Sequence, residues 1–227
     1  RMRLLRVPLL ALALGALPAS VALVPADAHA SVSIAVGYDA LVGDADVVAV
    51  VVPLEHTSVW EDGRIYTYTK VRVEQGVAGD LGAGAEGWVR TMGGVVGKIG
   101  QLVDGEPVFV PQKPSLLFLR RFRQQATFEV SARSQGQYPV VLDEATQIRR
   151  VVRSANVGVL LPPKAKSRVA DATGGAAPQS TGTRPDVDAQ PKIRLAGEVL
   201  HDRPLDEVAR EIAATWKRLH PTPPAKK

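Results

Sequence analysis

The sequence predicts a mainly β protein, an antiparallel barrel or sandwich followed by a C-terminal amphipathic helix. Three observations lead to this fold class. An Asp-Gly bend joins two runs of β-branched residues, short apolar segments follow between glycine, proline and polar turns, and apolar residues recur at helical spacing near the C-terminus. The hydrophobic fraction of 45% in 227 residues is sufficient for a buried core.

Residues 1–30 have the pattern of a signal peptide. Arg1–Arg6 is basic, Val7–Leu23 is apolar without a charge, and Ala28–Ala30 forms an Ala-x-Ala site. We therefore expect cleavage after Ala30 and export to the periplasm or the exterior. The alternative is an uncleaved anchor, because the apolar run is about as long as the shortest membrane-spanning helices. Only in that case do we expect contact with a membrane.

Composition excludes several kinds of chemistry. The chain has no cysteine, which rules out disulfides, thiol catalysis and cysteine metal sites. The formal net charge of +5 comes in part from the signal peptide, and such a mild excess concerns solubility rather than nucleic acid. We expect no nucleic-acid partner.

The clearest local element is a hairpin. Two β-branched runs, Val47–Val52 and Ile65–Val73, flank a turn at Glu61–Gly63. The second run alternates, as a half-buried strand does. One face carries Ile65, Thr67, Thr69, Val71 and Val73, and the other carries Tyr66, Tyr68, Lys70, Arg72 and Glu74.

Further short strands complete the predicted β domain, residues 31–161, which begins with a short helical lead-in over residues 37–45. These strands are expected at Gly87–Met92, Pro107–Val110, Ser115–Arg121, Thr127–Ala132, Gln137–Leu142 and Gln147–Ser154. Closing the sheet into a barrel would remove its exposed edges.

The C-terminal part divides into a linker and a helical segment. Residues 162–192 are rich in Pro, Gly, Ser, Thr and Ala and predict a disordered linker or long loop. Within residues 193–227, apolar side chains recur at helical spacing from about 204 to 219, with Pro204 suited to the first turn. Because a single amphipathic helix is not a domain, we expect it to pack on the β unit, the alternative being a partner or membrane.

The glycine-rich stretch Thr91–Gln101 invites comparison with a phosphate-binding loop. A P-loop requires glycine, four residues and then Gly-Lys-Ser/Thr, whereas here Gly97-Lys98 is followed by Ile99 and preceded, at the position of the first glycine, by Met92. The dinucleotide fingerprint fails at the same methionine. We therefore interpret the stretch as a structural turn with positive φ angles or close backbone approaches.

No catalytic, metal-binding or cofactor-binding residue is predicted. The four histidines lack metal-ligand spacing and no Gly-x-Ser-x-Gly elbow is present. The carboxylates Glu61, Asp62, Asp104 and Glu106 occupy turn positions, where turn chemistry accounts for them. Their alternative use is acid/base catalysis or calcium binding.

Two groups of residues are candidates for binding. Trp60, Tyr66 and Tyr68 surround the hairpin and could form a sugar-stacking or protein-binding face, unless they only pair across the strands. Arg120, Arg121 and Arg123 end an apolar strand, as a solvated strand end or as a patch for anionic polysaccharide or phospholipid.

Residues Ala45 to about Val141 resemble a group of uncharacterised exported bacterial proteins. The resemblance rests on the Ala-Asp-Val-Val strand, the Trp-Glu-Asp hairpin, the Gly-Gly-x-x-Gly turn, Pro-x-Phe and the Leu-Leu-Phe-Leu strand, in this order. This chain departs from the pattern at Gln112-Lys113 and at Pro53. More distantly, the hairpin is similar to that of netrin-like and tissue-inhibitor-of-metalloproteinase modules. This resemblance implies an OB-like antiparallel barrel, but the inhibitors' N-terminal cysteine is missing.

We expect a non-enzymatic binding or structural module of the cell envelope or exterior, with an envelope or extracellular protein or glycan as its partner and no cofactor. Fold alone does not fix function. The alternatives are a hydrolase whose carboxylates converge only in the folded chain and an inhibitor that docks its loops into a protease.

Overall fold

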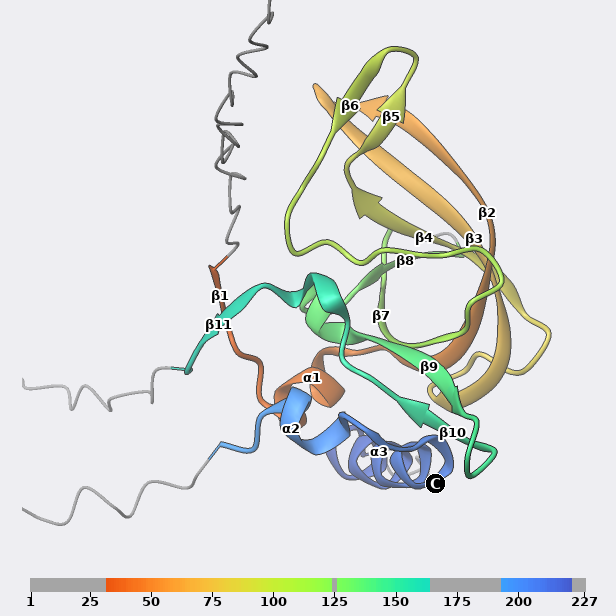
Figure 1. The fold of residues 1–227 in the computed structure, drawn as a ribbon, viewed down its shortest axis with the longest axis vertical. Coiled ribbons are helices and arrows are strands. Elements are labelled where there is room, and N and C mark those ends of the chain that lie inside the picture. The colour runs from red at the N-terminus through yellow and green to blue at the C-terminus, as the bar shows by residue number, and fades with distance from the viewer. Residues whose placement is uncertain (1–31, 124–125, 164–192, 222–227) are drawn as a thin grey trace, which may run out of the picture.

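The structure is a computed structural model that describes residues 32–123, 126–163 and 193–221 (Figure 1). Residues 1–30 of the expected signal peptide and residues 164–192 of the expected linker lie outside these ranges. The elements are β1 (Val32–Ile34), α1 (Tyr38–Asp44), β2 (Val47–Glu61), β3 (Arg64–Ala78), β4 (Glu86–Met92), β5 (Gly94–Val96), β6 (Ile99–Gln101), β7 (Ser115–Arg121), β8 (Thr127–Val130), η1 (Arg133–Gly136), β9 (Gln137–Asp143), β10 (Ile148–Val151), η2 (Ala155–Val157), β11 (Val159–Leu161), α2 (Ala196–Leu200), β12 (Arg203–Pro204) and α3 (Leu205–Leu219).

The prediction of a mainly β chain is confirmed, and most strands belong to one large mixed sheet. Its order is β12-β10-β9-β7-β2-β3-β4-β8, with an additional pairing between β7 and β8. The prediction of a purely antiparallel arrangement is wrong, because β4 and β8 pair in parallel. The direction follows from the connections: β7 runs antiparallel to β2 and β8 antiparallel to β7, so β8 points the same way as β4. Separate two-stranded ribbons are formed by β1 with β11 and by β5 with β6.

The long hairpin of β2 and β3 turns at the predicted Asp-Gly. Asp62 and Gly63 have φ angles of 48° and 76°, and this pair of positive angles matches the right-handed twist of the two strands. Pro53 lies inside β2 beside a register shift between Pro53 and Glu55. Since proline has no N–H for the ladder, a bulge at this point accommodates it within the strand.

The first part of β2 and most of β7 are buried on both faces and separate two hydrophobic cores. Along β2, Val48 and Val50 enter one core while Val47, Ala49 and Val51 enter the other. The Leu-Leu-Phe-Leu run of β7 divides in the same way. This double burial explains why both segments read as continuous apolar runs, whereas β3 alternates.

The strand predicted at Pro107–Val110 does not form. The backbone N–H of Val108 donates to Gln137 Oε1 at 3.2 Å, and Gln137 Nε2 donates to the carbonyl of Val108 at 2.6 Å. A buried glutamine side chain therefore satisfies this backbone in place of a neighbouring strand.

The amphipathic C-terminal helix is confirmed, and it packs on the β unit. In Figure 1 α3 lies below the sheet beside α1 and α2. Leu205, Val208 and Ile212 of α3 belong to the core that Val48 and Val50 enter from β2. None of the helices in the described ranges combines the length and apolarity that a bilayer crossing requires.

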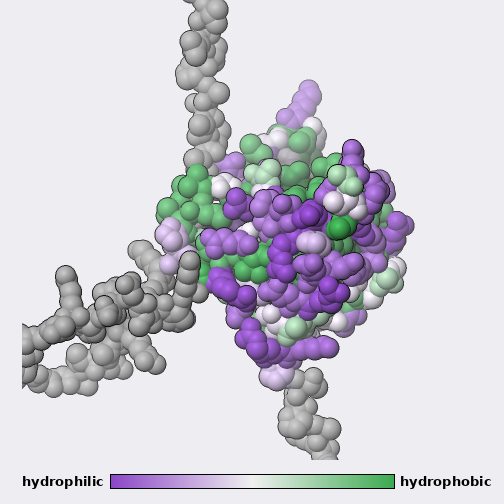
Figure 2. Space-filling model, turned by 60° about the horizontal axis from the view of Figure 1, so that its bottom comes forward, coloured by the Kyte–Doolittle hydropathy of each residue, from purple (hydrophilic) through white to green (hydrophobic). Residues whose placement is uncertain are grey.

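The outer surface is uneven in polarity. The face shown in Figure 2 is mainly hydrophilic, and its apolar part gathers beside the grey segments, where β1 and β11 lie. There the side chains of Val32, Ile34, Val159 and Leu161 are exposed.

Candidate functional site

The inward face of β3 and β4 changes from apolar to hydroxyl-bearing along its length. Val71, Val73 and Val89 belong to a hydrophobic core, whereas Thr67 and Thr91 follow toward the hairpin turn. Strand alternation keeps these threonines on the inward face, because the side-chain period of a strand is two residues. The inward side of the sheet therefore ends in a polar region.

This region borders a cavity of about 620 Å³, here called the hydroxyl cavity. Thr67 Oγ1 lies 2.8 Å from Ser58 Oγ and donates to the carbonyl of Gly93 at 2.7 Å, and Thr91 Oγ1 donates to the carbonyl of Thr67 at 3.4 Å. The opposite wall comes from the segment after β6. The polar residues that line the cavity, apart from Thr57 whose side chain projects to the other side with Tyr68, are His56, Ser58, Thr67, Thr69, Thr91, Gln101, Glu106 and Asn156.

The glycine-rich stretch closes one side of the hydroxyl cavity and folds into the small hairpin β5–β6, which the sequence did not predict. Gly93 and Gly94 have φ angles of 100° and 133°. A Cβ atom on Gly94 would overlap the hydroxyl groups of Ser58 and Thr67. The interpretation of these glycines as a structural turn is confirmed, because close packing and positive φ both require them.

On the outward face, Arg90 is held between two carboxylates. It donates from Nη2 to Glu61 and from Nη1 to Glu129, both at 2.8 Å, and its guanidinium lies 3.4 Å from the ring centre of Tyr66. Tyr68 donates a hydrogen bond to Glu61. We call these five residues the Arg90 cluster. The Arg90 side chain is only 11% exposed, and its Nε has no hydrogen-bond partner among the described residues.

The Arg90 cluster shifts the ionisation of its members. Hydrogen bonds from Tyr68 and Arg90 lower the pKa of Glu61 below its ordinary value. Burial, followed by the hydrogen bond to Glu61, raises the pKa of Tyr68. Burial by itself would lower the pKa of Arg90, but its bonds to Glu61 and Glu129 outweigh burial and raise it. The cluster therefore favours the charged form of Glu61 beside a charged Arg90.

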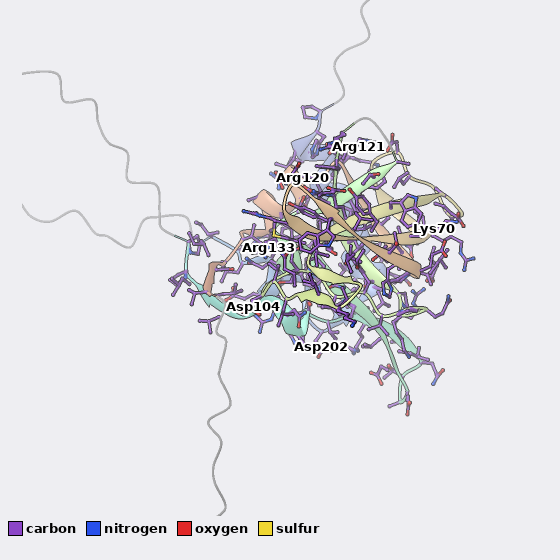
Figure 3. All side chains as sticks on the ribbon, turned by 90° about the horizontal axis from the view of Figure 1, so that it is seen from above. Lys70, Asp104, Arg120, Arg121, Arg133 and Asp202 are labelled. Carbon is purple, nitrogen blue, oxygen red and sulfur yellow. The ribbon has the colours of Figure 1, made fainter. Side chains whose placement is uncertain are left out.

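A second cavity of about 570 Å³, the charged cavity, lies beside this cluster. Arg90, Arg120, Arg133, Glu106 and Glu129 supply its charged side chains. Figure 3 looks down from the hairpin end, and Arg120, Arg133 and Asp104 are labelled one below another in the left half of the folded body. Arg133 donates from Nε to Glu106 at 2.6 Å and from Nη2 to the carbonyl of Asp104 at 2.9 Å.

The two cavities share a wall made by the end of β4 and the segment after β6. Met92 N–H donates to Glu106 Oε2 at 3.1 Å, and Thr91, Met92, Val103, Glu106 and Pro107 border both cavities. Glu106 was predicted as a turn residue, with acid/base catalysis or calcium binding as the alternative, and in the structure it connects Met92 with Arg133.

The aromatic residues expected to form one face do not share it. In the β2–β3 register Trp60 lies opposite Ile65, whereas Tyr66 lies opposite Val59. Since directly paired residues project to the same side, Trp60 projects with Ile65 to the side of the hydroxyl cavity, and Tyr66 and Tyr68 project to the other side.

The three arginines after the Leu-Leu-Phe-Leu run have different partners. Arg120 pairs across the strands with Glu129, at 4.0 Å between charged atoms, and borders the charged cavity. Arg121 binds Asp80 at 2.5 Å, and Arg123 lies 4.9 Å from the ring centre of Phe122. Each of the three arginines therefore makes a different contact within the protein.

The sequence contained a signal for one cavity and not for the other. Its alternation placed Thr67 and Thr69 on the inward face, which is where the hydroxyl cavity lies. Arg90 was missed, because its partners Glu61 and Glu129 are 29 and 39 residues away along the chain. In the part of the chain that the structure describes, no three His, Asp or Glu residues are close enough to hold a metal ion.

Comparison of the chain with protein-family models, with curated proteins and with solved structures gave no match. The chemistry of the two cavities therefore carries the functional argument.

Proposed function

We propose that the protein is a non-enzymatic binding module whose hydroxyl cavity holds part of a polyhydroxylated chain, such as a glycan. The observation that carries the proposal is the cavity of about 620 Å³ bordered by Ser58, Thr67, Thr69 and Thr91. Hydroxyl groups both donate and accept hydrogen bonds without adding charge, and so do the hydroxyl groups of a sugar. The volume is within the usual range of ligand pockets, about 300 to 1,000 Å³.

We infer that the binding module is an OB-like closed barrel. The pairings β2–β3, β3–β4, β4–β8, β8–β7 and β7–β2 support closure, because together they return to the first strand. The core of Val47, Val71, Val89, Leu117 and Phe128 supports it too, since one member comes from each of these strands. A barrel of this kind presents its ligand at an open end or on a strand face.

Our proposal places this module in the cell envelope or outside the cell. The support is the signal-peptide pattern of residues 1–30, and a chain without cysteine relies on its hydrophobic cores there.

The hydrolase alternative finds less support in the charged cavity. Its carboxylates Glu106 and Glu129 are both bound to arginine, at 2.6 and 2.8 Å. Both carboxylates are thus already engaged by groups of the protein, and neither is left free to exchange a proton with a substrate. The binding module is therefore the function that the geometry favours.

The test is calorimetric titration of the protein with hexasaccharides of glucose and of N-acetylglucosamine. Thr91→Val keeps the side-chain shape and removes one hydroxyl from the cavity, so it should weaken binding about fivefold, which corresponds to one hydrogen bond of about 1 kcal/mol. Thr127→Val is the matched control, because Thr127 lies on β8 and does not border the hydroxyl cavity. Absence of binding by both sugars, or equal affinity of the Thr91 variant and the parent protein, would refute the glycan proposal.

A further inference from the structure

Exposed apolar side chains gather at the end of the molecule formed by two hairpin turns. Leu102 is 88% exposed, Val95 65% and Ile99 57%, and Trp60 is half exposed. We call these four residues the apolar tip. Scattered exposed apolar residues are ordinary on a protein surface, but a contiguous group marks a contact with a partner or a membrane.

The two hairpins are held together at this end. The N–H of Gly93 donates to the carbonyl of Ile65 at 2.7 Å, and the N–H of Ile65 donates to Gln101 Oε1 at 2.9 Å. Figure 1 shows β5 and β6 next to the end of β2, at the extremity of the molecule. The apolar tip is therefore a protruding end, and two of its residues, Val95 and Leu102, also border the hydroxyl cavity.

The β5–β6 ribbon is apolar on both of its faces. Val96 pairs with Ile99 and Val95 with Gly100, so Val95 and Ile99 project to opposite sides. A protein partner would cover one side of such a ribbon, whereas a bilayer surrounds it. The backbone groups of the ribbon pair with each other, which avoids the cost of unsatisfied polar groups in an apolar medium.

Basic side chains flank the apolar tip. Arg64 follows the β2–β3 turn and Lys98 lies in the β5–β6 turn, and both are exposed. Within the described ranges neither forms an ion pair with a carboxylate, and the acidic residues beside them are Glu61, which is bound to Arg90, and Asp62. Apart from the Glu61–Arg90 pair, the exposed residues Asp62, Arg64 and Lys98 carry one positive charge in excess, which is complementary to the surface of an anionic bilayer.

We propose that the apolar tip inserts into the interfacial layer of a membrane that contains anionic lipid. Val95, Ile99 and Leu102 enter the acyl boundary, Trp60 lies at the headgroup level where tryptophan is enriched, and Arg64 and Lys98 contact the lipid phosphates. The contact is independent of the apolar segment Val7–Leu23 and does not rest on the proposed glycan binding.

The absence of cysteine permits a position-specific test in the full chain. Single variants Val95→Cys, Ile99→Cys and Leu142→Cys are labelled with an environment-sensitive dye and mixed with vesicles. The vesicles contain phosphatidylcholine alone or phosphatidylcholine and phosphatidylglycerol in equal parts. Leu142 is the control, because it is also exposed but lies on β9. The position of the dye separates insertion of the tip from binding through Val7–Leu23.

We expect the dye emission to rise and shift to the blue at Val95 and Ile99 with the anionic vesicles, and to stay unchanged at Leu142. Replacement of Lys98 or Arg64 by glutamine should reduce the affinity for the anionic vesicles about fivefold each, since a basic residue near the surface contributes about 1 kcal/mol. Unchanged emission at both tip positions overturns the proposal, as does an equal response at Leu142. An equal response with phosphatidylcholine alone overturns the role assigned to the basic residues.

Discussion

Arg90→Ala is expected to lower the free energy of unfolding by about 3 kcal/mol. The variant removes two charge-assisted hydrogen bonds, to Glu61 and Glu129, whose side chains are 25% and 31% exposed. Because solvent partly screens these bonds, each counts at the lower end of its range, about 1.5 kcal/mol. The lost stacking on Tyr66, at 3.4 Å, adds about 1 kcal/mol. The variant also removes the buried Nε, which has no hydrogen-bond partner among the described residues, and this offsets the loss by about 1 kcal/mol.

Urea denaturation followed by circular dichroism measures this loss. The midpoint should fall while the slope of the unfolding free energy against urea stays unchanged, because the surface exposed on unfolding is the same. In a thermal melt, about 3 kcal/mol corresponds to a decrease of roughly 6 to 12 °C for a chain of this size.

A double-mutant cycle separates the ionic contribution from simple packing. Arg90→Ala in a Glu129→Gln background should cost less than in the parent protein, since one of its bonds is already weakened. A loss below about 1 kcal/mol, or an equal loss in both backgrounds, would show that solvent screening cancels the ion pairs and that the reasoning is wrong.

Three further outcomes are expected. The unfolding free energy should fall as the pH drops below 4.5, the ordinary pKa of Glu61, because the pKa of Glu61 is lowered in the folded state and protonation ends its bonds to arginine and tyrosine. Urea unfolding of Glu61→Gln across this range should show a flatter dependence on pH. Equal slopes for the variant and the parent protein would contradict the assignment. Gly94→Ala should destabilise more than Gly97→Ala in thermal melts, because the first Cβ meets packed hydroxyl groups and the second meets open space; the reverse order would contradict the packing. Ile212→Ala should cost about 2 to 5 kcal/mol and the exposed Arg210→Ala less than about 0.5 kcal/mol, as measured by urea unfolding, if α3 is part of the core.

The relation between sequence and structure differs from one element to the next. The β2–β3 turn and the helix at Leu205–Leu219 were readable because Asp-Gly and a helical-period stripe are local patterns. The segment Pro107–Val110 is apolar, as the strands are, but the backbone of Val108 forms its hydrogen bonds with the side chain of Gln137. Local composition shows that a segment can form a strand, but it does not identify the hydrogen-bond partner of that segment in the folded chain.

The candidate site divides in the same manner. Alternation placed Thr67 on the inward face, and its bond to Gly93 confirms that this face is polar near the turn. The separation of Trp60 from Tyr66 also followed from alternation, since the two are on opposite faces once the turn fixes the register. The prediction of one aromatic face was wrong, because Trp60 and Tyr66 are close in the sequence but project to opposite sides of the sheet.

By itself the sequence determined the β-rich character, the faces of β3, the central hairpin and the apolar stripe of α3, because each depends on residues near one another in the chain. Only the tertiary structure decided the parallel pairing of β4 with β8, the ion pairs of Arg90 and the two cavities beside them. The physical reason is that these features join segments distant along the chain, and their partners are selected by strand direction and register in the folded sheet rather than by local propensity.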